Sequence, residues 1–226
     1  MKGFFKLYYP IFPIVGLVLY VIVFTVASSN YPGGSVNVPH DTGYSFFHNF
    51  LCDVMNPVTQ GGKVNHARPL AVVSHLILSG SMISFFYVLP EIFETSNRNT
   101  RMIRGFGMTT MTVFILMCTK HHDAIVTATA VLGSLALIPF FIELRKYSGQ
   151  KLKNLAYACY AMSIIVFLIF VTKIGFYYLP FIQKITFVLD AWWVVWVSLI
   201  VSRKNQISAQ ALLEEVVLSK SASQSL

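Results

Sequence analysis

The sequence is poor in charged residues and in cysteine. Lys, Arg, Asp and Glu make up 12% of the 226 residues, whereas hydrophobic residues make up 55%, more than one soluble core of this size can bury. The cysteines Cys52, Cys118 and Cys159 show no CxxC or other metal-ligand spacing, and an odd number cannot all pair within the chain. These shortages argue against a soluble domain, a disulfide framework and a dithiol redox motif.

Several functional motifs are missing as well. The chain has no phosphate-binding loop, no GxSxG nucleophile elbow and no CxxCH haem attachment, and its apolar runs carry no acidic ladder typical of a proton pump. The formal net charge is +8, but the basic residues lie in short clusters between apolar runs. Such clusters are typical of membrane orientation signals, so we expect membrane lipids as surroundings and no nucleic-acid partner.

Long apolar runs are what the sequence does contain. Each is near the length of about 20 residues that a membrane helix needs, and none alternates with period two, which favours helices over a barrel. We predict an all-α, polytopic membrane bundle whose six transmembrane helices cover residues 11–28, 70–93, 102–118, 124–144, 155–178 and 185–202. These helices form one domain, 1–206, followed by a cytoplasmic tail, 207–226. The first run also has signal-peptide features, and we expect it to be a retained helix.

The distribution of basic residues predicts the orientation. With the N-terminus inside, most of the 17 Lys and Arg residues lie on the cytoplasmic side, so we expect both termini in the cytoplasm of a plasma or bacterial inner membrane. All 6 histidines then lie on the extracytoplasmic side or in the outer half of a helix. A one-sided supply of histidine and aspartate suits a zinc site. The alternative is that polar residues simply collect in the long outer loop.

The loop over residues 30–68 is far longer than the other connections, and long loops are usually functional or disordered. Within it, YSFFHNFLCDVMNP has helical periodicity, with Ser45 as a plausible N-cap and Asn56-Pro57 as a stop. We predict an interfacial helix over 44–56 whose phenylalanines face lipid or the bundle and whose polar face carries Asp53. This helix is either part of a catalytic site or an amphipathic lid with no catalytic role.

Polar residues also lie inside the predicted helices. Ser74 and His75 lie in the second helix, and Asp190 lies in VLDAWW of the sixth. An ionisable group at such depth normally faces the bundle interior and has a partner. For Asp190 the simplest partner is Lys173, unless Lys173 extends to the membrane surface instead.

The stretch TKHHDAIV places histidines and an aspartate at the start of the fourth predicted helix. Asp123 is favourable there because the first turn carries the positive end of the helix dipole, so capping alone explains it. Adjacent residues on a helix point about 100° apart, so only one of His121 and His122 is expected to point inward. We choose His122. The pattern matches no standard zinc motif such as HExxH.

Three segments resemble an uncharacterised six-helix membrane family, domain of unknown function 998: NYPGG, SFFHNFLCDVMNP and HHDAIVTATAVLG. The resemblance covers most of the chain and implies a six-helix fold with an outer polar site. In the logic of its site, the chain is also distantly similar to the alkaline-ceramidase-like membrane hydrolases, which use Ser, Asp and three His around zinc. That similarity implies catalytic roles for Ser74, Asp53 and Asp190.

The leading hypothesis is metal-dependent hydrolysis of a lipid-like substrate. His75, His122 and Asp123 are the candidate ligands of a zinc ion that lowers the pKa of a bound water. Asp53, Asp190 and Ser74 are the candidate catalytic residues. The alternative is a non-catalytic membrane subunit or a protein that binds lipid or a protein partner, including a second copy of the chain, in which the same residues are structural.

Overall fold

The computed structural model describes residues 7–119 and 122–224 of the chain. Within these residues the chain forms an all-α bundle, as predicted. The α-helices are α2 (Phe12–Ser29), α3 (Arg68–Val88), α4 (Arg98–Phe114), α5 (His122–Lys146), α6 (Gln150–Thr172) and α7 (Leu179–Gln224). Short 3-10 segments flank them: η1 (Tyr9–Ile11), η2 (Asp53–Met55), η3 (Leu89–Ile92), η4 (Ile115–Cys118) and η5 (Phe176–Tyr178).

Five segments are long and apolar enough to cross a membrane, where the sequence predicted six spans. They are Tyr9–Ser29, Arg68–Ile92, Ala124–Lys146, Gln150–Thr172 and Phe176–Ala211. The predicted third span corresponds to α4, which has 17 residues and carries Arg98, Arg101 and Arg104 in its first two turns. α4 nevertheless packs within the bundle, between α3 and α5.

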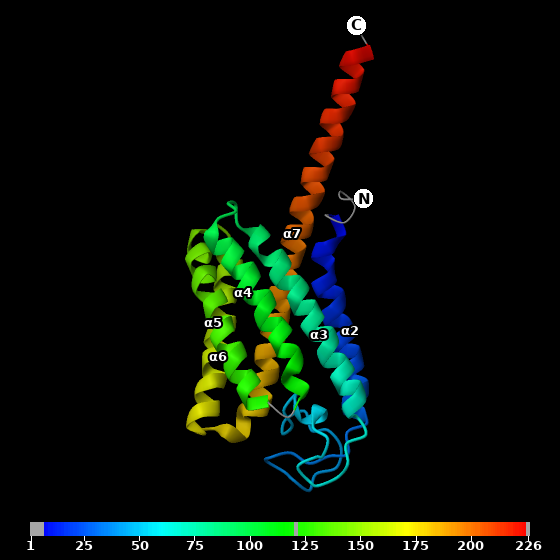
Figure 1. The fold of residues 1–226 in the computed structure, drawn as a ribbon, viewed down its shortest axis with the longest axis vertical. Helices are drawn as coiled ribbons and strands as arrows, with labels where there is room; N and C mark the ends of the chain where they lie inside the picture. Colours follow the sequence, from blue (N-terminus) through cyan, green and yellow to red (C-terminus); the bar gives the residue numbers. More distant parts are fainter. Residues whose placement is uncertain (1–6, 120–121, 225–226) are drawn as a thin grey trace.

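Successive helices run in opposite directions, so α2 begins and α7 ends at the same end of the bundle (Figure 1). The loop over residues 30–67 covers the opposite end (Figure 1). We call these the terminal end and the loop end. α7 is a single helix of 46 residues that extends beyond the bundle, so no break separates the predicted sixth span from the predicted tail at 207 (Figure 1).

Small residues allow the helices to approach closely, as is usual in membrane bundles. A Cβ atom added at Gly16 of α2 would lie 2.6 Å from Cβ of Ser81 in α3, and Ser81 Oγ donates to the carbonyl of Pro13 at 2.8 Å. A Cβ atom added at Gly107 of α4 would collide with the ring of Phe86. Large side chains fill the terminal half of the interior: Phe85, Val88, Ile103, Phe140, Leu144, Val197 and Val201.

The prediction of an interfacial α-helix over 44–56 is wrong. The segment consists of turns followed by the short 3-10 segment η2. Ser45 Oγ does accept the amide of His48 at 3.3 Å, so one turn begins where it was predicted. After this turn, side-chain oxygens accept hydrogen bonds from the backbone amides, in place of the backbone carbonyls that would accept them in a helix. Asn49 Oδ1 accepts the amide of Ser45 at 2.9 Å, and Asp53 Oδ2 accepts the amide of Phe50 at 2.9 Å. Such local bonds compete with the helical ladder, which explains the failure.

The loop is nevertheless firmly docked on the bundle. Ala27, Tyr31, Val54, Ala67 and Ala71 form a buried apolar cluster that joins it to α2 and α3. On the other side, hydrogen bonds join it to the connection between α6 and α7. Asn37 Nδ2 donates to the carbonyl of Tyr177 at 2.8 Å, the Nε2 of His48 lies 3.0 Å from the Tyr177 hydroxyl, and the amide of Leu51 donates to Gln183 Oε1 at 3.2 Å.

Candidate functional site

A cavity of about 550 Å³ lies in the loop half of the bundle. Its lining comes from the loop and from every helix, α2 through α7, and Phe50, Leu51, Cys52 and Met55 of the loop contribute to it. This volume is within the range of small-molecule sites, about 300–1,000 Å³. The loop therefore forms one wall of a partly open space between the helices.

The lining is mostly apolar and rich in aromatic rings. The aromatic residues are Tyr20, Phe24, Phe50, Phe114, Phe167, Phe170, Phe176 and Phe187. The aliphatic residues and methionines are Leu51, Met55, Ala71, Leu78, Met117, Val126, Val166 and Leu179. Such a lining favours hydrocarbon over water, because apolar surface gains free energy when it leaves water.

Several polar groups of the cavity are already hydrogen-bonded. Ser74 Oγ donates to the carbonyl of Ala71 at 2.7 Å, and Thr186 Oγ1 donates to the carbonyl of Ile182 at 3.0 Å. His75 Nε2 lies 2.9 Å from the carbonyl of Phe114, and the two rings are in contact. This bond holds α3 to the end of α4 and explains why an imidazole is tolerated within an apolar helix.

Asp190 differs from these groups. It lines the cavity from α7 and is half-buried, and the Cys159 thiol of α6 is its hydrogen-bond partner. The predicted pairing with Lys173 is wrong. Lys173 ends α6 in the left-handed region at φ 61°, and its Nζ lies 4.2 Å and 4.6 Å from the ring centres of Phe170 and Phe176. No Lys, Arg or His within the described part of the chain forms an ion pair with Asp190.

Asp53 lies beside the cavity, in the docked loop. Its side chain is 4% exposed, and its Oδ2 accepts from Asn49 Nδ2 at 3.0 Å and from the Phe50 amide. Lys184 of α7 is also buried and donates to the carbonyls of Asn49 at 2.5 Å and Pro180 at 3.0 Å. Burial raises the pKa of Asp53, although its two hydrogen bonds and the charge of Lys184 oppose this change.

The neighbouring thiol of Cys52 is unreactive for a related reason. Burial, together with the carboxylate of Asp53, raises its pKa to about 12, so the nucleophilic thiolate is scarce at neutral pH. Cys52 therefore contributes to the cavity as a small apolar side chain.

The structure thus brings together three of the six predicted site residues. Ser74, His75 and Asp190 line one cavity, and Asp53 lies in the loop next to Cys52. His121 and the side chains of His122 and Asp123 lie outside the described part of the chain. Among the residues that are described, no three His, Cys, Asp or Glu side chains are grouped as metal ligands. The zinc hypothesis, which depends on His122 and Asp123, stays a prediction.

Sequence reasoning singled out Asp190 but missed the other members of a polar stripe on α7. Gln183, Thr186 and Asp190 all line the cavity, and Ser163 faces it from α6. Their spacing of three and four places the α7 residues on one face of a helix. That spacing within an apolar run was a usable signal, whereas the contact of Lys184 with the loop leaves no trace in the sequence.

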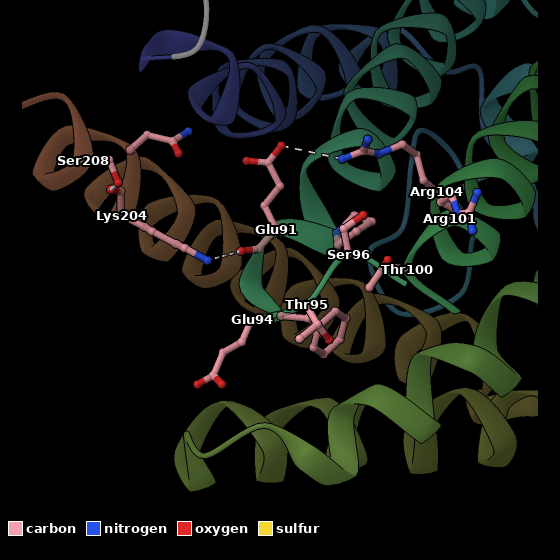
Figure 2. Close-up of a pocket in the computed structure, with 12 residues that line it drawn as sticks. Glu91, Glu94, Thr95, Ser96, Thr100, Arg101, Arg104, Lys204 and Ser208 are labelled. Atoms are coloured by element: carbon pink, nitrogen blue, oxygen red, sulfur yellow. Dashed lines mark hydrogen bonds and ion pairs between the residues drawn. The ribbon is translucent and has the colours of Figure 1, made fainter. Parts of the chain in front are cut away.

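A second, ionic pocket of about 310 Å³ lies at the terminal end (Figure 2). Arg104 of α4 pairs with Glu91 at 3.6 Å and donates its Nε to the Tyr87 carbonyl at 3.1 Å. Lys204 of α7 donates to the Glu91 carbonyl at 3.0 Å, as Figure 2 shows. The pocket contains none of the predicted site residues.

The helices and the cavity define a class: an all-α bundle with five helices fit to cross a membrane and an apolar cavity under a docked loop. Comparison with known proteins finds no match among family models, curated proteins or solved structures. The resemblance to the uncharacterised six-helix family therefore stays a prediction.

Proposed function

We propose that this membrane protein binds a lipid-like amphiphile, with the hydrocarbon part of the ligand in the cavity. The observation that carries the proposal is the 550 Å³ space lined by aromatic and aliphatic side chains. A hydrocarbon chain in this space would gain van der Waals contacts with these side chains, and part of the lining, Phe167 and Phe170, is exposed where lipid could enter.

The loop supports this proposal because it covers the cavity and is docked on both sides. The basic clusters at the terminal end favour a cytoplasmic position for that end, so the loop end would face the extracytoplasmic side. In this orientation the ligand would lie in the outer half of the membrane, and the exposed apolar side chains of α6, such as Phe167 and Phe170, would adjoin the outer leaflet.

Paired tryptophan substitutions on α6 test this proposal. Val166 lines the cavity, whereas its neighbour Ile165 is 42% exposed and does not. Val166→Trp should lower the affinity for a radiolabelled long-chain alcohol about tenfold or more, a loss of about 1.4 kcal/mol, because the indole would occupy part of the space that the hydrocarbon needs. Ile165→Trp, measured on the same purified protein in detergent, should bind like the wild type. Equal affinities in all three proteins, or no binding by the wild type, would contradict the proposal.

A second candidate function is metal-assisted hydrolysis of the bound lipid. The observation that favours it is that Ser74, His75 and Asp190 line the same cavity. Purified protein should then contain stoichiometric zinc that is lost in His75→Ala and in His122→Ala, and it should cleave ester-linked or amide-linked lipids. Metal-free protein that binds lipid without turnover would exclude this candidate and leave the binding function.

A further inference from the structure

We infer that the ligand of the cavity is a long-chain amine whose ammonium group pairs with Asp190. This inference rests on the proposed binding function and adds the chemical class of the ligand. It combines three features of the cavity: a carboxylate with no ion-pair partner among the described side chains, aromatic walls, and a polar stripe that leads to the carboxylate from the loop.

The carboxylate is the first feature. Asp190 lies near the middle of the segment Phe176–Ala211, and no cationic side chain of the described residues forms an ion pair with it. A charge within a membrane is costly unless it has a partner. The thiol of Cys159 is a weak donor and does not neutralise the charge. A cationic ligand would supply the missing partner.

The aromatic walls are the second feature. The faces of aromatic rings attract ammonium groups within about 6 Å of the ring centre. Two rings of this cavity already contact an ammonium group: Nζ of Lys173 lies 4.2 Å from the ring centre of Phe170 and 4.6 Å from that of Phe176. Tyr20 and Phe187, which are themselves in contact, line the cavity on its α2 and α7 sides. The lining thus suits a cation as well as a hydrocarbon chain.

The polar stripe of α7 is the third feature. Thr186 and Gln183 lie about one and two turns from Asp190 on the same face of the helix, toward the loop. The hydroxyl hydrogen of Thr186 is donated to the Ile182 carbonyl, which leaves the oxygen able to accept. A primary ammonium has three donors, so one can meet Asp190 while others meet hydroxyl oxygens. An anionic head group would instead be repelled by Asp190.

Three probes of equal chain length test the inference: a long-chain primary amine, the corresponding alcohol and the corresponding carboxylic acid. At pH 7 the wild type in neutral detergent should bind the amine at least about tenfold more tightly than the alcohol, and the acid most weakly. Asp190→Asn should remove the preference, so that the amine and the alcohol bind this variant with similar affinity. Asp190→Glu should retain the preference, which keeps the test informative if the asparagine variant fails to fold. Glu94→Gln, at the terminal end, is the matched charge control.

The outcomes separate the inference from the proposed function. Equal binding of amine and alcohol, strongest binding of the acid, or an amine preference that survives in Asp190→Asn would overturn the inference while hydrocarbon binding stands. Failure of all three probes to bind the wild type would overturn both.

Discussion

The two ends of the bundle treat charge and space in opposite ways. At the terminal end, charged side chains pair with one another: the partly exposed Arg104 pairs with Glu91, as Figure 2 shows, and the buried Glu143 pairs with Lys146 at 3.0 Å. The interior behind them is filled by large side chains. At the loop end, Asp53 and Lys184 are buried, and the interior contains a cavity. The loop end thus retains buried charges and unfilled volume together, a combination that costs stability and is typical of a binding site.

The difference arises from what closes each end. Short connections close the terminal end, so the side chains of the helices can interdigitate there. The loop end is closed by residues 30–67, whose polar groups bond to one another and to α7 and hold the loop over the space below. The predictions that test this contrast are given from the largest expected effect, in the packed interior, to the smallest, at the exposed ion pair.

The largest effect is expected in the packed interior, at Gly107. Gly107→Ala should lower the free energy of unfolding by about 3 kcal/mol, the upper end of the usual cost of overpacking, because the new Cβ would collide with the Phe86 ring. Gly105→Ala is the matched control on α4, since a Cβ there meets nothing within 4 Å and alanine favours helix. Thermal unfolding of the two variants in detergent measures the difference. Equal unfolding temperatures would show that this part of the bundle can accommodate extra volume.

An intermediate effect is expected at the contact between loop and bundle. Lys184→Met removes the donor to the Asn49 carbonyl and should cost about 1–3 kcal/mol through an unsatisfied buried acceptor. The loop should also become more sensitive to protease, which limited proteolysis followed by mass spectrometry can measure.

The matched control for this variant is Lys63→Met in the same loop. Lys63 is exposed and donates to the Pro32 carbonyl at 3.4 Å, so its loss should have little effect. If both variants are cleaved at the wild-type rate, Lys184 does not hold the loop in place.

The smallest effect is expected at the ion pair of the terminal end. Arg104 and Glu91 keep 38% and 28% of their side chains exposed, and partly exposed pairs contribute about 0–1 kcal/mol. Arg104→Met should therefore lower the unfolding temperature only slightly, and added salt should reduce the difference further. A loss as large as that of Lys184→Met would contradict the contrast between the two ends.

Much of the fold was predictable from local patterns. The apolar runs predicted the α-helical bundle. Their boundaries agree with both ends of α5 to within two residues, whereas those of α3 differ by up to five residues and those of α6 by up to six. α4 was also predicted as a span; it forms a helix with three arginines in its first two turns, and it is not among the five segments that are long and apolar enough to cross a membrane. The predicted helix over 44–56 is absent because the side chains of Asn49 and Asp53 accept hydrogen bonds from backbone amides. Hydrophobic periodicity does not reveal such bonds.

The candidate site was predictable only in part. The free-energy cost of a polar group in lipid correctly indicated that Ser74, His75 and Asp190 face the interior, since a membrane helix rarely exposes such groups to lipid. The partners were not predictable. His75 bonds to Phe114, 39 positions away, and Lys173 lies over two phenylalanines instead of pairing with Asp190.

The sequence by itself determined that the chain forms apolar helices and which side chains are too polar for lipid, because both depend on the transfer energy and spacing of single residues. Only the tertiary structure decided which of these groups meet. A cavity exists where side chains from α2 to α7 and the loop fail to fill a volume, and no one of these segments encodes that shortfall. The lack of a cationic partner for Asp190 among the described side chains is likewise a property of the packing, since it depends on which groups the neighbouring helices place around it.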